Sequence, residues 1–308
     1  EYTYAQKVMK VRRVIKRIAI VAVPIVLGVL VGLPVYNTGV LIIRHEEVRI
    51  KSGDVELAAT ISSPRWGSGP FPALVSVHGS GLVEREHLSG DWRRLVPHGI
   101  VVLTYDKRGV GESSGRFQEV RLASSEEQLR TLAADARACL EFLKNHPRVD
   151  PKRVGFFGGS QASWIIPLAA DGRTDVAFNV ILAGAATSSG IETHYSALTG
   201  DGHRPVEPLS TEEIDRRLQA YDGPTGFDPV PVLARSKTPA LWLLGARDLS
   251  TPAERSRQAL EKLREQGVPI TIKVYPDGNH GLHSVTTGRR LPFYEDTVEW
   301  LKKEGILN

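Results

Sequence analysis

The stretch Arg153-Val-Gly-Phe-Phe-Gly-Gly-Ser-Gln-Ala162 decides the fold. It is a short apolar run that ends in glycines, a lone serine and another small residue, and a helix-like stretch, 164–170, follows at once. A strand that turns into a helix through such small residues holds its central side chain, Ser160, on a sharp bend. Gly158 and Ala162 flank it where larger groups would collide. This is the G-x-S-x-G pattern with alanine in the last place, and it predicts a nucleophile at Ser160.

Two further residues fit the partners that an activated serine needs, a base and an acid that orients the base. The segment 240–248 reads as a buried strand whose end delivers Asp248, and 270–275 alternates like a strand and leads to His280. The chain order is therefore Ser160, Asp248, His280, each at the end of a predicted strand. That order is the one found in α/β-hydrolases.

Each partner has an alternative interpretation. Taken alone, Asp248 also reads as a turn or helix-capping carboxylate, and a histidine such as His280 as a surface loop residue. His283 is a rival base three residues further on. Gly281 favours His280, because it fits a tight loop that leads out of the strand.

A possible oxyanion hole lies upstream. The strand 71–78 is followed by Gly79-Ser80-Gly81. A glycine-rich loop at this place can present backbone N–H groups to a developing oxyanion, together with the N–H of Gln161, the residue after the nucleophile. We expect Ser80 to supply the loop donor, with Gly81 as the competing candidate.

From about Glu46 to Asn308 the chain resembles α/β-hydrolases, and among them the prolyl-oligopeptidase-like and dienelactone-hydrolase-like esterases. The matching motifs are His78–Gly81, Tyr105–Gly115, Gly159–Ala170, Leu244–Asp248 and Gly278–Gly281. Relatives usually carry glycines in place of Ala162 and Ser163, and often a histidine in place of Gly159. The resemblance implies serine hydrolase activity on esters, and sometimes on amides or peptides.

Strands and helices alternate along the rest of this region. A hairpin is expected around Ser52-Gly-Asp54, and the apolar runs 100–105 and 178–183 fit strands buried on both faces of a parallel sheet. Two capping boxes, 125–128 and 251–254, predict helix starts. The expected fold is the α/β-hydrolase fold: a doubly wound, mostly parallel eight-stranded sheet with a small cap insert, preceded by one transmembrane helix.

The cap insert is assigned to residues 188–237, which are too many for a simple crossover between two strands. One helix is expected in it, 211–221, capped by Ser210 and Glu213. We interpret the insert as a cap over Ser160; the alternative is an ordinary surface excursion. Candidates for the acyl pocket, or for solvated polar residues, are His194, Tyr195 and His203.

The loop Asp106–Gly111 is rich in glycine but has neither Walker spacing nor a G-x-G-x-x-G pattern that opens a helix. It is expected to be a structural loop beside the active site. Asp106 and Arg108 would fix it through local hydrogen bonds.

The N-terminal region predicts a membrane anchor. Residues 18–36 hold nineteen residues without a charge, which is the length of a membrane-spanning helix. Six basic residues precede them, so the positive-inside bias places residues 1–17 in the cytoplasm and the hydrolase domain outside. A cleaved secretory signal is the alternative, although the apolar core is long for one. Residues 37–45 then form a linker, and the hydrolase domain covers 46–308.

Gly28 and Gly32 have the small-xxx-small spacing that lets two membrane helices approach closely, so a homodimer through them is a further hypothesis.

Composition argues against several other functions. The net charge of +4 comes from the N-terminal arm: six of the 39 basic and one of the 35 acidic residues precede position 18, which leaves 33 and 34. Nucleic-acid binding is therefore not expected. The single cysteine, Cys139, is expected in the core, and no cluster has the spacing of a zinc site.

The sequence thus predicts a membrane-anchored serine hydrolase, a carboxylesterase acting on a small-molecule ester or peptide-like substrate without a metal or organic cofactor. A peptidase, an amidase or an acyltransferase would use the same residues. From a different class, an inactive membrane-tethered scaffold is the alternative, and the complete triad argues against it.

Overall fold

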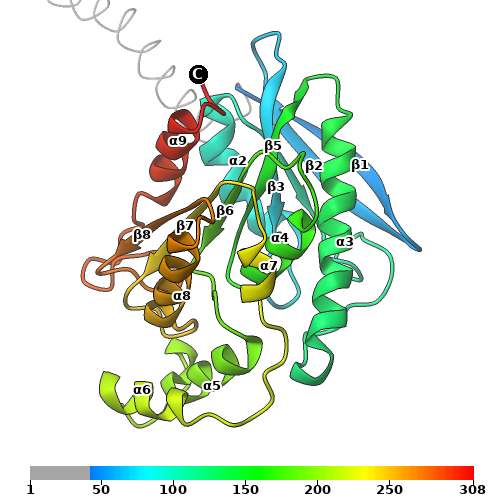
Figure 1. Ribbon diagram of the computed structural model, residues 1–308. Helices are drawn as coiled ribbons and strands as arrows, with labels where there is room; N and C mark the ends of the chain where they lie inside the picture. Colours follow the sequence, from blue (N-terminus) through cyan, green and yellow to red (C-terminus); the bar gives the residue numbers. More distant parts are fainter. Residues whose placement is uncertain (1–41) are drawn as a thin grey trace, which may run out of the picture. The chain divides into compact units, whose positions relative to one another are not determined.

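Eight strands form one sheet in the order β1-β2-β4-β3-β5-β6-β7-β8 (Figure 1). The computed structural model describes residues 42–308. The strands are β1 Ile43–Ser52, β2 Val55–Pro64, β3 Phe71–Val77, β4 Val101–Tyr105, β5 Val149–Gly159, β6 Asn179–Leu182, β7 Ala240–Gly245 and β8 Ile270–Tyr275. β2 runs antiparallel to β4, and all pairs from β4 to β8 are parallel. The prediction of a mostly parallel eight-stranded sheet is confirmed.

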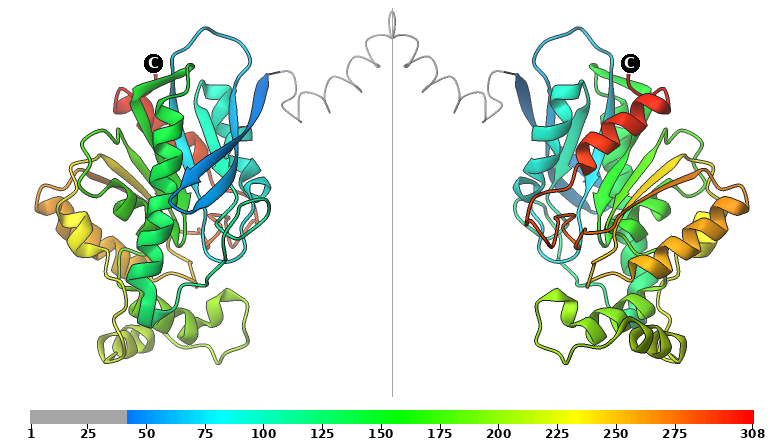
Figure 2. Two further views of the ribbon diagram at one scale, coloured as in Figure 1. Left: turned by 90° about the vertical axis from the view of Figure 1, so that its right-hand side faces the viewer. Right: turned by 90° about the vertical axis from the view of Figure 1, so that its left-hand side faces the viewer.

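Helices cover both faces of this sheet (Figures 1 and 2). They are α2 Ser89–Leu95, α3 Ser125–Lys144, α4 Ala162–Ala170, α5 Ser189–Thr199, α6 Thr211–Gln219, α7 Val230–Ala234, α8 Ala253–Glu265 and α9 Phe293–Lys303. Short 3₁₀ turns are η1 Arg85–Leu88, η2 Val96–His98, η3 Leu122–Ser124 and η4 Gly200–Gly202. α2 packs against α9, whereas α3, α4, α7 and α8 contact one another in turn. This is the doubly wound arrangement that the alternating sequence predicts.

The core lies between the sheet and these helices. Every residue of β4 is buried, as expected of a central strand with both faces covered. α3 buries one stripe at helical spacing, from Leu129 through Ala136 to Leu140, against the sheet. Cys139 lies in the same stripe as a buried free thiol, in accord with the expected core position.

Both predicted capping boxes are wrong, although helices begin close to the predicted places. α3 begins at Ser125, whose Oγ donates to the Leu122 carbonyl and accepts from the Phe227 N–H, 2.8 Å away. α8 follows Pro252, and Thr251 donates its hydroxyl to Asp248 instead of capping the helix. In each case the hydroxyl of the predicted capping residue bonds outside the helix, and for Ser125 the N–H that it accepts comes from far along the chain.

The insert between β6 and β7 contains more helix than expected. α6 begins where predicted, with the Ser210 Oγ accepting from the Glu213 N–H, and it ends two residues before Tyr221. α5 was not predicted from the sequence; the Ser188 Oγ caps it by accepting from the Ile191 N–H. Figure 1 shows both helices beyond the carboxyl ends of the strands, where the site lies.

The arm 1–17, the proposed anchor 18–36 and its glycines Gly28 and Gly32 lie outside the described residues. No helix between residues 42 and 308 is both long and apolar enough to cross a bilayer. β1 begins at Ile43, within the last three residues of the predicted linker, 37–45.

Candidate active site

Ser160 stands on a strained turn between β5 and α4. Its φ of +56° lies in the left-handed region, which side chains other than glycine rarely adopt. The Ser160 N–H donates to the Leu182 carbonyl at 2.9 Å and fixes the turn to the neighbouring strand β6. A Cβ on Gly158 would lie 2.3 Å from the Val77 carbonyl oxygen and 2.7 Å from the Ala162 Cβ. The small residues around Ser160 are therefore required by the close packing of this turn.

Asp248 is a buried carboxylate that follows β7. Its Oδ1 accepts the backbone N–H groups of Ser250 and Thr251 at 2.7 and 2.9 Å. Its Oδ2 accepts the Thr251 hydroxyl at 2.7 Å. Four acceptor sites on an ionised carboxylate allow one more donor, and that donor is a histidine.

His280 follows β8, and its Nδ1 lies 2.9 Å from Asp248 Oδ2. Because this carboxylate accepts hydrogen bonds, the proton belongs on Nδ1, and Nε2 is left with a lone pair. Burial alone would lower the pKa of His280, but the hydrogen bond and the negative charge of Asp248 outweigh it and raise the pKa. The rival His283 is exposed and offers its backbone N–H to Asn279 Oδ1.

The three candidate residues follow the carboxyl ends of β5, β7 and β8, which run parallel in one sheet. Parallel strands present these ends at the same edge, where ligands of open α/β sheets bind. Thr251 connects the candidate acid with the pocket of the candidate nucleophile. Its hydroxyl bonds to Asp248, and it lines the same pocket as Ser160.

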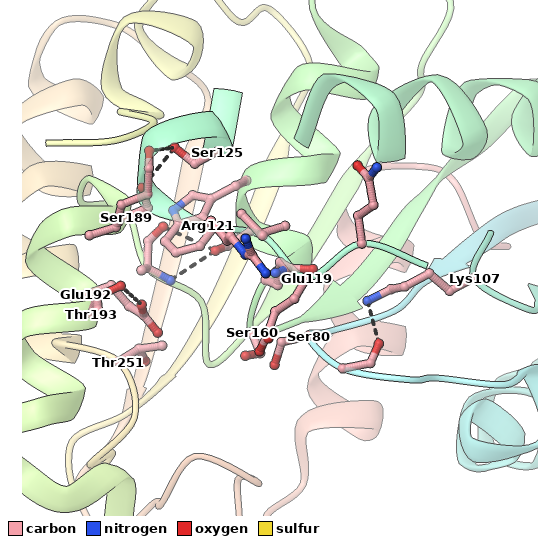
Figure 3. Close-up of a pocket in the computed structure, with 18 of the residues that line it drawn as sticks. Ser80, Lys107, Glu119, Arg121, Ser125, Ser160, Ser189, Glu192, Thr193 and Thr251 are labelled. Carbon is pink, nitrogen blue, oxygen red and sulfur yellow. Dashed lines mark hydrogen bonds between the residues drawn. The ribbon is translucent and has the colours of Figure 1, made fainter. Parts of the chain in front are cut away.

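The loop that follows β3 lies directly against Ser160. A Cβ on Gly79 would lie 3.5 Å from the Ser160 Cβ, so the backbone comes within contact distance of the candidate nucleophile. Ser80, Gly81 and Gln161, the predicted oxyanion-hole residues, line one pocket with Ser160 (Figure 3). His78, just before the loop, is fully buried with its ring 4.4 Å from that of Tyr105.

Lys107 also lines this pocket, and its contacts could not be read from the sequence. Its Nζ donates to the carbonyl oxygens of Gly79 and Gly81, 2.7 and 3.0 Å away. Burial lowers the pKa of Lys107 to about 8. The loop Asp106–Gly111 is thus in direct contact with the predicted oxyanion loop.

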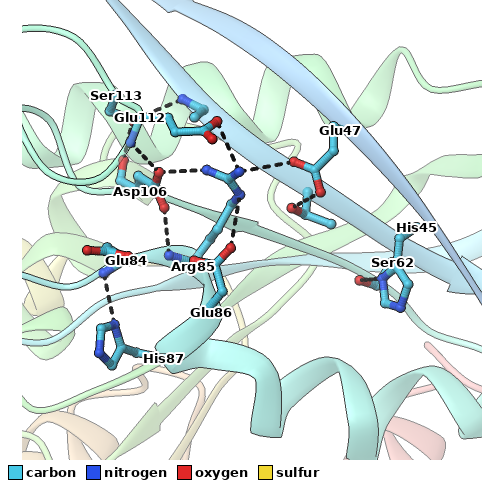
Figure 4. Close-up of polar contacts among 12 residues, drawn as sticks. His45, Glu47, Ser62, Glu84, Arg85, Glu86, His87, Asp106, Glu112 and Ser113 are labelled. Atoms are coloured by element: carbon cyan, nitrogen blue, oxygen red, sulfur yellow. Dashed lines mark hydrogen bonds and ion pairs between the residues drawn. The ribbon is translucent and has the colours of Figure 1, made fainter. Parts of the chain in front are cut away.

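The loop Asp106–Gly111 is also fixed by contacts of the Asp106 carboxylate. Its carboxylate accepts the Arg85 N–H at 2.7 Å, the Arg85 guanidinium at 2.6 Å and the Glu112 N–H at 2.8 Å (Figure 4). Arg108 pairs through two bonds with the buried Asp135 on α3. The expectation that Asp106 and Arg108 act structurally fits these contacts.

The pocket beside Ser160 has a volume of about 350 Å³. Its walls come from the oxyanion loop, from residues 117–122 and from α5, and it carries the charged side chains of Lys107, Glu119, Arg121 and Glu192 (Figure 3). Burial and the charge of Asp201 raise the pKa of Glu192 to about 7. This volume lies at the lower end of the range of small-molecule binding pockets.

The cap is tied to the segment that carries Asp248. The Tyr195 hydroxyl donates to the Asp248 carbonyl at 2.6 Å, and the Thr199 hydroxyl donates to the Leu249 carbonyl at 2.5 Å. Both donors belong to α5. Tyr195, a candidate pocket residue, therefore serves as an attachment of the cap.

Known proteins resemble much of this chain in sequence. The sequence model of the prolyl oligopeptidase family matches residues 87–305. Esterase EstD of Thermotoga maritima is 27% identical over 275 residues, which cover 81% of this chain and 62% of EstD. In the curated relatives that head the comparison, this chain spans 18% to 62% of the relative's length.

Solved structures share the fold. An esterase of Pyrococcus furiosus has a TM-score of 0.60 at 17% identity, over 84% of this chain and 92% of that one. The acylaminoacyl peptidase of Pyrococcus horikoshii has a TM-score of 0.61 at 20% identity, over 87% of this chain and 43% of that one. At such identities the likeness establishes the α/β-hydrolase fold alone.

Proposed function

Because the chain belongs to the prolyl oligopeptidase family, we propose that it is a serine hydrolase, and more specifically a carboxylesterase that acts through an acyl-enzyme on Ser160. The observation that carries the proposal is the hydrogen bond from His280 to Asp248, at the sheet edge where Ser160 stands on its strained turn. These three residues supply the roles of nucleophile, base and orienting acid.

In the proposed mechanism the His280 Nε2 accepts the hydroxyl proton as Ser160 attacks the acyl carbonyl. The buried Asp248 keeps the proton of the imidazole on Nδ1 and stabilises the imidazolium that forms. The backbone N–H groups of Gln161 and of Ser80 or Gly81 stabilise the tetrahedral oxyanion. His280 then protonates the leaving alcohol, and in the second half it activates the water that releases the acid.

Esters are favoured as substrates by the similarity to EstD and by a small pocket next to Ser160. A peptidase or amidase is the second candidate, supported by the family match and by the likeness to the acylaminoacyl peptidase. Transfer of the acyl group to an acceptor other than water would use the same acyl-enzyme. An inactive scaffold would have no need for the bonded Asp248–His280 pair.

We further propose that residues 18–36 anchor the enzyme in a membrane, with residues 1–17 cytoplasmic and the hydrolase domain extracytoplasmic. The support is the uncharged run and the six basic residues before it. A dimer through Gly28 and Gly32 is part of this proposal. Protease protection of the C-terminal domain in sealed vesicles tests the orientation, and cross-linking in detergent tests the dimer.

Labelling by a fluorophosphonate probe tests the catalytic proposal. The wild type should be labelled, whereas Ser160→Ala and His280→Ala should not. His283→Ala is the matched control and should be labelled like the wild type. Labelling that survives Ser160→Ala would place the nucleophile elsewhere. Rates on matched ester and anilide substrates with the same acyl group then separate an esterase from an amidase.

A further inference from the structure

Lys107 is a buried cation behind the predicted oxyanion loop. It follows β4, and its relative exposure is 2%. Among residues 42–308 no carboxylate forms an ion pair with it, and its two hydrogen bonds go to the carbonyl oxygens of Gly79 and Gly81. Burying an ammonium group without a carboxylate partner costs several kcal/mol, on the order of the desolvation penalties of buried ions.

These two bonds fix the directions of particular peptide groups. In a trans peptide, the C=O of one residue and the N–H of the next point to opposite sides. With the Gly79 carbonyl held on the side of Lys107, the Ser80 N–H points away from Lys107. The Gly81 N–H belongs to a different peptide group, whose carbonyl is that of Ser80 and makes no bond to Lys107. The clamp therefore orients the Ser80 N–H through the Gly79 carbonyl and the Leu82 N–H through the Gly81 carbonyl, and it makes no bond to the peptide group that carries the Gly81 N–H.

The clamped segment also lies against the candidate nucleophile. The Gly79 backbone approaches Ser160 within contact distance, as the 3.5 Å separation of the two Cβ positions requires. Lys107, Ser80 and Ser160 line one pocket (Figure 3). A cation bound to one end of a peptide group also polarises the N–H at its other end, because linked hydrogen bonds strengthen one another.

We propose that Lys107 is a positioning residue for the oxyanion hole: it holds Gly79 and Gly81 by their carbonyl oxygens so that the Ser80 N–H, rather than the Gly81 N–H, binds the oxyanion formed at Ser160. The inference rests on the proposed hydrolase function and deepens it. Lys107 acts through the loop and makes no bond to the substrate.

The first test compares Lys107→Met with the wild type. Loss of an oxyanion-hole donor lowers kcat by about 10²- to 10³-fold, so we expect a fall of about 10²-fold in kcat with KM changed less than about 3-fold. Affinity for a trifluoromethyl ketone, whose adduct carries the oxyanion, should fall by the same factor as kcat. Lys144→Met is the matched control, since it removes an ammonium bonded to Asp175 at the far end of α3.

A second variant, Lys107→Ala, distinguishes the effect of losing the ammonium charge from the effect of losing side-chain packing. In Lys107→Ala, n-propylammonium replaces the missing atoms and can reach the site through the pocket that Lys107 lines. It should restore most of the lost rate of fluorophosphonate labelling, whereas 1-propanol should not. Labelling is used as the readout because an added amine can also attack an acyl-enzyme.

The outcomes distinguish this inference from the function on which it rests. A folded wild type that is neither labelled nor active overturns both. A labelled wild type with a Lys107→Met variant of unchanged kcat and ketone affinity overturns the role of Lys107 alone. If the variant loses thermal stability and kcat but keeps its ketone affinity, the effect comes from lost packing. That result also overturns the positioning role of Lys107. If Lys107→Met does not fold, Lys107→Gln is measured in the same way.

Discussion

The Nδ1 atom of His280 lies 2.9 Å from Asp248 Oδ2, on a carboxylate whose other oxygen is already held by two backbone N–H groups. The carboxylate therefore cannot rotate without breaking bonds to its own loop. The orientation of the imidazole ring is fixed by the fold of residues 248–251.

Replacing Asp248 by Asn should lower kcat by about 10⁴-fold, because an amide that keeps the two loop bonds presents its NH₂ group to His280 and favours the wrong tautomer. Thr251→Val removes one bond to the same carboxylate, and we expect a loss of about 10-fold in kcat. Steady-state kinetics on one ester measures both. An Asp248→Asn enzyme with more than a tenth of wild-type kcat would contradict the assigned role.

The pH dependence of kcat/KM should follow His280. The base must be neutral, so activity is lost as the pH falls through its pKa. Asp248 raises that pKa above its ordinary value of 6.5, and the acidic limb should therefore lie above pH 6.5. In Asp248→Asn, the residual activity should show a limb shifted to lower pH. A wild-type limb below pH 6 would contradict the assignment.

Because of Asp91, the free energy of unfolding should be larger in mild acid than at neutral pH. The Asp91 carboxylate is buried in α2 between the hydroxyls of Ser76 and Tyr294, and burial raises its pKa to about 6. Between about pH 4 and pH 6 the folded state binds more protons than the unfolded state, so stability falls as the pH rises. Asp91→Asn has no charge to bury. Its stability relative to the wild type should increase by about 2 kcal/mol from pH 4 to pH 7, measured by urea unfolding. A pH-independent difference would contradict this.

Gly158→Ala should damage the turn that carries Ser160. The new methyl group would meet the Val77 carbonyl and the Ala162 side chain, and we expect a loss of about 3 kcal/mol in unfolding free energy together with loss of labelling. Ala162→Gly is the control, with a cost of about 1 kcal/mol and labelling retained. The double variant, Gly158→Ala with Ala162→Gly, removes the clash with the Ala162 side chain but keeps the clash with the Val77 carbonyl, so it should stay destabilised. Recovery in the double variant would mean that the Val77 contact is unimportant.

The sequence was informative wherever a signal was local. The small residues around Ser160, the buried strand that leads to Asp248 and the alternating strand that leads to His280 each lie within about ten consecutive residues. The parallel sheet then places those strand ends at one edge, which a βα alternation implies. Fold class and candidate residues follow from such patterns without knowledge of long-range contacts.

Other features depend on partners far along the chain. Lys107 bonds to a loop 26 to 28 residues earlier, and nothing in its own neighbourhood distinguishes it from a solvated lysine. Thr251 has the pattern of a helix cap, yet its hydroxyl bonds to Asp248. α5 has few apolar residues at helical spacing, and it is held instead by its Ser188 cap and by bonds to the segment after β7.

The attachment of Tyr195 and Thr199 to the carbonyls of Asp248 and Leu249 limits how substrate can enter. A hinged lid exchanges an open, inactive state for a closed, active one. Here, lifting α5 would pull directly on the backbone that orients His280, so opening in that way would switch off the base. The position of α5 and the orientation of His280 are therefore coupled through the backbone of Asp248 and Leu249.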